Sequence, residues 1–147
     1  MRLKIGDKAP EFETLDQNEK KVKLSDFREK KVVLYFYPKD NTPGCTIEAC
    51  SFRDDIQMFD KIKAKIIGVS IDDITSHKKF VEKYKLNFTL LVDDKKEISQ
   101  KYGVLNIFGK AGRTTFLINE KGIIRHIFEK VNPEGHVKEV LGVLGKE

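Results

Sequence analysis

The feature that most restricts the fold of this chain is one unbroken apolar run, Val32-Val33-Leu34-Tyr35-Phe36-Tyr37. Because the run is continuous rather than alternating, it predicts a β-strand over 31–37 that is buried on both faces. A second run of the same kind, 65–71, follows a stretch in which apolar residues recur at helical spacing. Buried strands that alternate with helices indicate a layered α/β domain.

The remaining patterns complete the order of elements. Shorter strands are predicted at 12–15, 21–24, 89–92, 114–118 and 123–128, and helices at 45–61, 75–84, 97–102 and 137–144. Ser25 is predicted to cap a helical turn over 25–28. The chain therefore begins with a β-hairpin and ends with a second hairpin and a helix. This order fits a thioredoxin-like fold with a central mixed β-sheet flanked by helices, in a single domain over 1–147.

Composition limits the cellular setting. No apolar run approaches the ~20 residues needed to cross a bilayer, and residues 1–7 lack the apolar stretch of a signal peptide. We therefore expect a soluble, cytoplasmic protein with no membrane partner. Two cysteines, Cys45 and Cys50, are too few for a disulfide scaffold. In a reducing compartment such a close pair is more often catalytic or metal-binding than structural.

Charge and histidine content narrow the function classes. The net charge is +5, but the lysines are scattered in pairs among acidic residues, and no basic stripe with interspersed aromatic residues is present. We expect a solvated mixed-charge surface and no nucleic-acid partner. His77, His126 and His136 lack the spacing of metal ligands and are interpreted as surface or partly packed residues. Neither a metal site nor a bound cofactor is predicted.

Cys45 lies where a buried strand gives way, through a loop, to a helix. Unpaired backbone N–H groups and the helix dipole favour an anion at a helix N-terminus. Such positions lower the pKa of cysteine thiols in general, so the placement favours a reactive thiolate. A buried structural cysteine and a metal ligand remain alternatives at this point, although Cys-x4-Cys is not a usual ligand spacing.

The local motif points to one chemistry. The spacing Pro38-x3-Thr42-x2-Cys45 resembles the active-site signature of the peroxiredoxins, the cysteine-dependent peroxidases. The segment 36–50, which reads FYPKDNTPGCTIEAC, is most similar to their bacterioferritin comigratory protein, or peroxiredoxin Q, subfamily. Residues 6–12 and 113–118 also resemble the entry segment and the arginine-bearing strand of that subfamily, so the resemblance covers most of the chain.

The resemblance implies a role for each matching residue. Cys45 would be the peroxidatic nucleophile and would be oxidised to a sulfenic acid. Thr42 would aim its hydroxyl at the thiolate and the peroxide, and Pro38 would end the strand and shield the pocket. Arg113 would stabilise the thiolate and the charge that develops on oxygen. Glu48 would pair with Arg113, or else would be an exposed first-turn acid that favours the helix dipole.

Cys50 would be the resolving cysteine, and a thioredoxin-type dithiol would reduce the resulting disulfide. Residues five apart in an intact helix have Cα atoms about 8.7 Å apart, whereas a disulfide needs them within about 7 Å. We therefore predict that the first turns of the helix unwind during resolution. The alternative is that Cys50 is a core residue and that an external thiol resolves Cys45. The resemblance further implies a monomer.

Two other functions compete with peroxide reduction at this stage. A dithiol oxidoreductase that acts on protein disulfides would share the fold, but such enzymes are expected to carry Cys-x-x-Cys. A basic binding or chaperone-like module would carry the cysteines incidentally. A Cys45→Ser variant separates these functions, because it should abolish only a peroxidase or oxidoreductase activity.

Overall fold

The central sheet has five strands in the order β5-β4-β3-β6-β7 in the computed structural model, which describes residues 2–146. The strands are β3 (Lys31–Phe36), β4 (Ala64–Ser70), β5 (Thr89–Val92), β6 (Thr114–Ile118) and β7 (Ile124–Phe128). Strands β3, β4 and β5 pair in parallel, whereas β6 pairs antiparallel with both β3 and β7. The predicted mixed sheet and its closing hairpin are confirmed.

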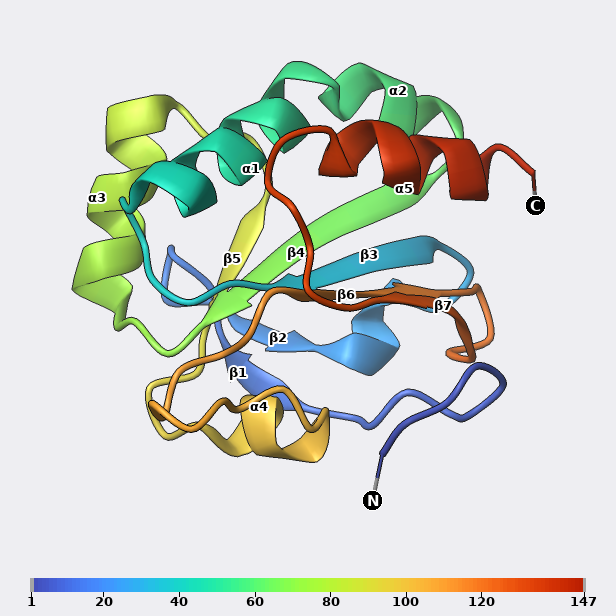
Figure 1. The fold of residues 1–147 in the computed structure, drawn as a ribbon, viewed down its shortest axis with the longest axis horizontal. Coiled ribbons are helices and arrows are strands. Elements are labelled where there is room, and N and C mark those ends of the chain that lie inside the picture. Colours follow the sequence, from blue (N-terminus) through green and yellow to red (C-terminus); the bar gives the residue numbers. More distant parts are fainter. Residues whose placement is uncertain (1, 147) are drawn as a thin grey trace.

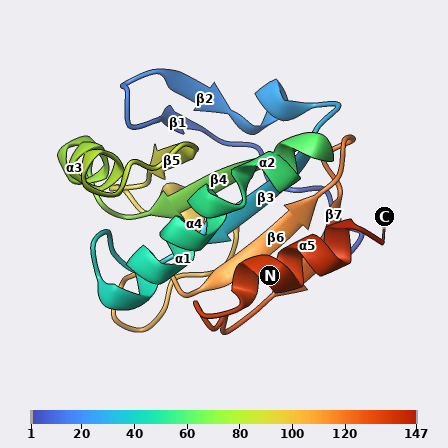
Figure 2. The ribbon, with the colours of Figure 1, turned by 90° about the horizontal axis from the view of Figure 1, so that it is seen from above.

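Helices and a hairpin cover the two faces of this sheet (Figure 1). The helices are α1 (Pro43–Asp54), α2 (Ile56–Lys61), α3 (Ile74–Tyr84), α4 (Glu97–Lys101) and α5 (His136–Leu144). Seen from above, α1, α2 and α5 lie across one face, and α3 lies beside β5 at the sheet edge (Figure 2). The hairpin of β1 (Glu13–Leu15) and β2 (Lys21–Lys23) lies with α4 on the opposite face. The predicted fold class is confirmed.

Strand β3 divides the core because its side chains alternate between the two faces. Val32, Leu34 and Phe36 pack with the hairpin and α4, whereas Val33 and Tyr35 pack with the helices α1, α2, α3 and α5. All five side chains are buried. The continuous apolar run is thus explained, since a strand covered on both faces has no position for a polar side chain.

Two local predictions are wrong. The helix expected over 45–61 is two helices that meet at Asp55. The apolar spacing hid this break, because Phe52 before it and Phe59 after it are both buried in the same cluster. Ser25 does not cap a helical turn: the 3-10 helix η1 (Leu24–Phe27) begins one residue earlier, and the carboxylate of Asp26 accepts the N–H of Lys23 at 3.0 Å.

The interpretation of the histidines as surface or partly packed residues is also wrong for two of the three. His77 on α3 and His136 on α5 are both 0% exposed. Each ring has polar neighbours on other elements, Asp40 and Leu91 around His77 and Thr115 beside His136. Sequence reasoning missed these sites because the partners are distant along the chain.

Candidate active site

Strand pairing brings Arg113 to the start of α1. In the antiparallel register of β3 and β6, Phe36 lies opposite Thr114. Arg113 directly precedes Thr114, so it falls beside the point where β3 ends and the β3–α1 loop (Pro38–Thr42) begins. Its backbone carbonyl accepts a hydrogen bond from Val131 N–H at 3.1 Å, which fixes the main chain there.

Cys45 is the third residue of α1, and its side chain is 1% exposed. The helical hydrogen bonds begin with Thr46 N–H to the Thr42 carbonyl at 2.9 Å, so the amides of Gly44 and Cys45 lie ahead of them. Nη2 of Arg113 donates to Sγ of Cys45 at 3.3 Å. The thiol therefore lies between the N-terminus of a helix and the permanent cation of Arg113.

Gly44 makes room for this contact. A Cβ atom at this position would lie 2.6 Å from Nη2 of Arg113. The absence of a side chain lets the guanidinium rest directly over the first turn of α1.

Glu48 lies one turn after Cys45 and contacts the same arginine. Nη1 of Arg113 donates to Oε1 of Glu48 at 3.3 Å, and the glutamate side chain is 1% exposed. Burial raises the pKa of Glu48 to about 7, although the charge of Arg113 acts in the opposite direction. Oε2 of Glu48 and the hydroxyl of Tyr35 are buried without a hydrogen-bond partner in the part of the chain that the structure describes. Glu48 is thus not an exposed first-turn acid.

Thr42 and Pro38 border the site from the β3–α1 loop. Thr42 is the N-cap residue of α1, and its hydroxyl donates to the Lys39 carbonyl at 3.0 Å. Within residues 2–146, no hydrogen bond joins Thr42 to Cys45. Pro38 is half-buried and lies two residues beyond the end of β3.

Cys50 lies in the same unbroken helix as Cys45, and both are free thiols. Cys45 is buried, whereas Cys50 is half-buried. Because both residues belong to α1, the five-residue helical separation applies, and it exceeds the span of a disulfide.

Two buried polar residues next to this site, Asp40 and His77, were not predicted from the sequence. Asp40, in the β3–α1 loop, is 6% exposed, and its carboxylate lies 2.6 Å from Nδ1 of His77 on α3. The sequence around His77 does not indicate that its side chain is buried. The dipeptide Asp40-Asn41 has the composition of an ordinary polar turn, so only the tertiary structure distinguishes it.

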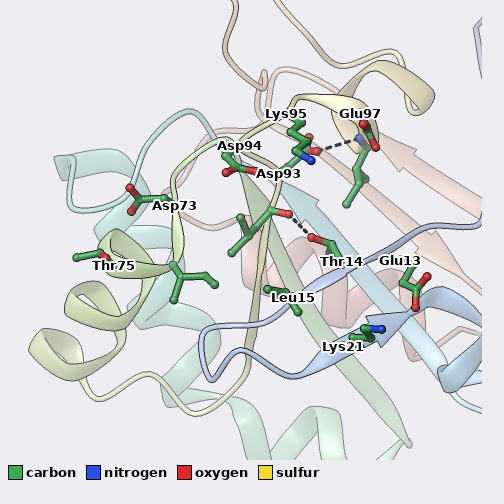
Figure 3. Close-up of a pocket in the computed structure, with 13 residues that line it drawn as sticks. Glu13, Thr14, Leu15, Lys21, Asp73, Thr75, Asp93, Asp94, Lys95 and Glu97 are labelled. Atoms are coloured by element: carbon green, nitrogen blue, oxygen red, sulfur yellow. Dashed lines mark hydrogen bonds between the residues drawn. The ribbon is translucent and has the colours of Figure 1, made fainter.

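A separate cavity of about 540 Å³ lies between the N-terminal hairpin, the start of α3 and the β5–α4 loop (Figure 3). None of the predicted site residues lines it. Asp93, one of several acidic residues that line it, is already engaged, because its carboxylate accepts the N–H groups of Ile98 and Ser99 at the start of α4. This cavity is therefore distinct from the cysteine site.

Within residues 2–146, no group of three or more His, Cys, Asp or Glu side chains is placed to hold a metal ion.

None of the helices in the described region is both long and apolar enough to cross a membrane.

A buried thiol under an arginine, at the start of a helix in a thioredoxin-like fold, defines a class of cysteine-dependent enzymes, and comparison with known proteins places the chain within it. The sequence model of the AhpC/TSA family matches residues 5–127. The chain belongs to this family.

Individual relatives match nearly the whole length of this chain. The putative peroxiredoxin bcp of Coxiella burnetii is 45% identical over 151 residues, covering 98% of this chain and 100% of the relative. Peroxiredoxin Bcp of Bacillus subtilis is 46% identical, covering 98% and 96%. The crystal structure of a PrxQ mutant from Xylella fastidiosa superposes with a TM-score of 0.94 at 31% identity, covering 99% and 98%. The resemblance to the bacterioferritin comigratory protein subfamily is confirmed, and the chain is a thiol-dependent peroxidase.

Proposed function

We propose that Cys45 reduces hydrogen peroxide and organic hydroperoxides, with Arg113, Thr42, Pro38 and Glu48 forming its surroundings. The observation that carries the proposal is the 3.3 Å contact between Nη2 of Arg113 and Sγ of Cys45, in the first turn of α1. A fixed cation at this distance stabilises both the attacking thiolate and the negative charge that moves to oxygen.

The first step oxidises the cysteine. The Cys45 thiolate attacks one peroxide oxygen, the O–O bond breaks, and an S–O bond forms. The second oxygen leaves as hydroxide or alkoxide and takes a proton to become water or an alcohol. Cys45 is left as a sulfenic acid, two electrons more oxidised than the thiol.

The second step uses Cys50. Its thiolate attacks Sγ of the sulfenic acid, the S–S bond forms, and the oxygen leaves as water. A dithiol of the thioredoxin type then supplies two electrons and two protons and regenerates both thiols. The half-buried state of Cys50 supports this role over that of a core residue. The helical separation of the two cysteines requires that the first turns of α1 unwind for this step.

We also propose that residues 1–147 form one domain, since two core clusters pack on the two faces of a single main sheet. The resemblance to the bacterioferritin comigratory protein subfamily further leads us to propose a monomeric, cytoplasmic enzyme.

The test is peroxide consumption by the purified, reduced protein, with and without a thioredoxin-type reductant. We expect stoichiometric consumption without the reductant and turnover with it. Cys45→Ser should abolish both, and Cys50→Ser should retain a single turnover but lose recycling by the reductant. Consumption that persists in Cys45→Ser would overturn the assignment of the nucleophile.

A further inference from the structure

The carboxylate of Asp40 is the centre of a buried hydrogen-bond network beside the active site. Oδ1 accepts the hydroxyl of Tyr37 at 2.6 Å, and Oδ2 accepts the hydroxyl of Ser76 at 2.7 Å. Oδ2 also lies 2.6 Å from Nδ1 of His77. Three groups converge on one carboxylate that is almost fully removed from water, and its oxygens are thereby satisfied by hydrogen bonds.

The surroundings of His77 then determine its protonation. Nε2 lies 2.8 Å from the backbone carbonyl of Leu91, which can only accept, so this nitrogen carries a proton. Nδ1 faces the Asp40 carboxylate and carries a proton for the same reason. A ring that donates from both nitrogens is an imidazolium. The buried cation and the buried anion compensate each other.

The charges around the ring support this assignment. Burial alone lowers the pKa of His77, but the hydrogen bond and charge of Asp40, the Leu91 carbonyl and the charge of Asp72 together raise it above its ordinary value. Asp72 lies two residues beyond the end of β4, and its carboxylate also accepts the N–H of Asp40 at 2.8 Å. Burial, followed by the charge of Asp40, raises the pKa of Tyr37, so this hydroxyl remains a donor.

This pair joins two elements that are distant in sequence. Asp40 belongs to the β3–α1 loop, and His77 and Ser76 belong to α3. The next loop residue, Asn41, is held to α3 as well, because its Oδ1 accepts from Tyr84 Oη at 3.0 Å and Lys83 Nζ at 3.3 Å. Asn41 has a left-handed backbone, with φ of 60°. Asparagine adopts this conformation more readily than most other non-glycine residues.

We propose that Asp40 and His77 are positioning residues for Cys45: their ion pair docks the β3–α1 loop on α3 and so holds α1 in the wound conformation that reduces peroxide. The proposal rests on the proposed function, in which α1 must unwind before Cys50 can reach Cys45. The loop leads directly into the first turn of α1, so releasing it from α3 removes the support on which that turn is built.

The pair thereby influences the fate of the sulfenic acid. In the wound helix, the Cys45 sulfenic acid can react with a second peroxide, which gives a sulfinic acid and water. In the unwound helix it reacts with Cys50, which gives the disulfide and water. Weakening the pair should favour disulfide formation over sulfinic acid formation. It should also slow the initial reduction of peroxide by Cys45.

The test compares Asp40→Ala, Asp40→Asn and the control Asp94→Ala, an exposed acid outside the site. The rate of peroxide reduction is measured in competition with a peroxidase of known rate, and the sulfinic and disulfide products are quantified by mass spectrometry. Loss of a hydrogen-bonded buried charge should slow peroxide reduction about tenfold in Asp40→Ala and lower the sulfinic fraction severalfold. The amide of Asp40→Asn can donate to a neutral His77 ring, so this variant should recover part of both losses.

A second readout does not depend on activity. Nitrogen-15 NMR of His77 in the wild-type protein at neutral pH should show both ring nitrogens protonated, and in Asp40→Asn only one. A ring with a single protonated nitrogen in the wild type would overturn the proposal, and so would an Asp40→Ala product ratio equal to that of Asp94→Ala. If Cys45→Ser still consumes peroxide, the proposed function fails instead, whatever the state of His77.

Discussion

At the scale of single residues, Arg113 places one positive charge beside two groups, the Cys45 thiol and the Glu48 carboxyl. One guanidinium nitrogen contacts the Cys45 thiol and another contacts the Glu48 carboxyl, each at 3.3 Å. A planar fork can hold both contacts at once, whereas the ammonium group of lysine is a single point charge. The geometry of the guanidinium, and not only its charge, is therefore part of the site.

We predict that Arg113→Lys lowers kcat/KM for peroxide by about a hundredfold, the effect typical of removing one group that stabilises developing charge. The free energy of unfolding should change little, because lysine keeps a positive charge near the buried carboxyl group of Glu48. Steady-state kinetics and urea denaturation measure the two quantities. Arg125→Lys, on the exposed part of β7, is the matched control. A kcat/KM equal to that of the control would show that charge alone suffices.

Glu48 makes the folding stability depend on pH. Its pKa is about 7 in the folded chain, compared with an ordinary value of 4.5. Between these two values the folded chain binds more protons at this group than the unfolded chain does, so folding stability declines as the pH rises. Glu48→Gln should remove this decline, on the order of 3 kcal/mol between pH 4.5 and 7.

Urea denaturation at several pH values measures this effect as the difference between wild type and variant. The exposed Glu120→Gln is the control. Parallel stability curves for wild type and Glu48→Gln across the interval would contradict the assignment of this pKa.

At the scale of elements, α1 carries both cysteines, and its packing opposes their meeting. Phe52 anchors the later part of the helix, with its ring 4.8 Å from that of Tyr35 and 5.7 Å from that of Phe59. Cys45 and Cys50 precede this anchor, so the helix can lose its first turns while the anchored part remains in place.

We therefore predict that oxidation removes hydrogen-exchange protection from the amides of residues 46–50 and leaves that of α5 unchanged. The physical reason is that the helical hydrogen bonds over these residues must open before the cysteines can bridge. Exchange measured by mass spectrometry on the reduced and disulfide forms tests this. Equal protection of residues 46–50 in the two forms would contradict local unwinding, and loss in α5 would indicate a wider rearrangement.

The elements themselves follow closely from the sequence, but the polar interior does not. The strand 89–92 and the helix ending at Tyr84 agree with the structure because the spacing of apolar residues depends on local periodicity. Asp40 and His77 were missed because their burial depends on partners 37 residues apart. For the site, the spacing of Pro38, Thr42 and Cys45 could be read directly from the sequence. The contact of Arg113 with Cys45 required the register of β3 and β6.

At the scale of the whole molecule, the redox state should change stability. A disulfide between Cys45 and Cys50 closes a very short loop, so it constrains the unfolded chain little. On the proposed mechanism, forming it removes the first two turns of α1, including the buried side chains of Cys45 and Ala49, from the core.

We predict that the disulfide form melts about 5 °C or more below the reduced form, because lost packing outweighs the gain from such a short cross-link. Calorimetry of the wild type with and without a dithiol measures the difference. Cys50→Ser, which cannot form the bridge, should show no shift of this origin. A disulfide form with the higher melting temperature would indicate that the core remains intact on oxidation.

The most direct test of Cys45 as the peroxidatic nucleophile is the mass of each cysteine-containing peptide after one equivalent of hydrogen peroxide. In Cys50→Ser, we predict one added oxygen atom on Cys45, trapped as a sulfenic acid. In the wild type, we predict loss of two hydrogen atoms in a bridge between Cys45 and Cys50. Oxygen added elsewhere, or an unmodified Cys45 after the peroxide is consumed, would show that Cys45 is not the nucleophile.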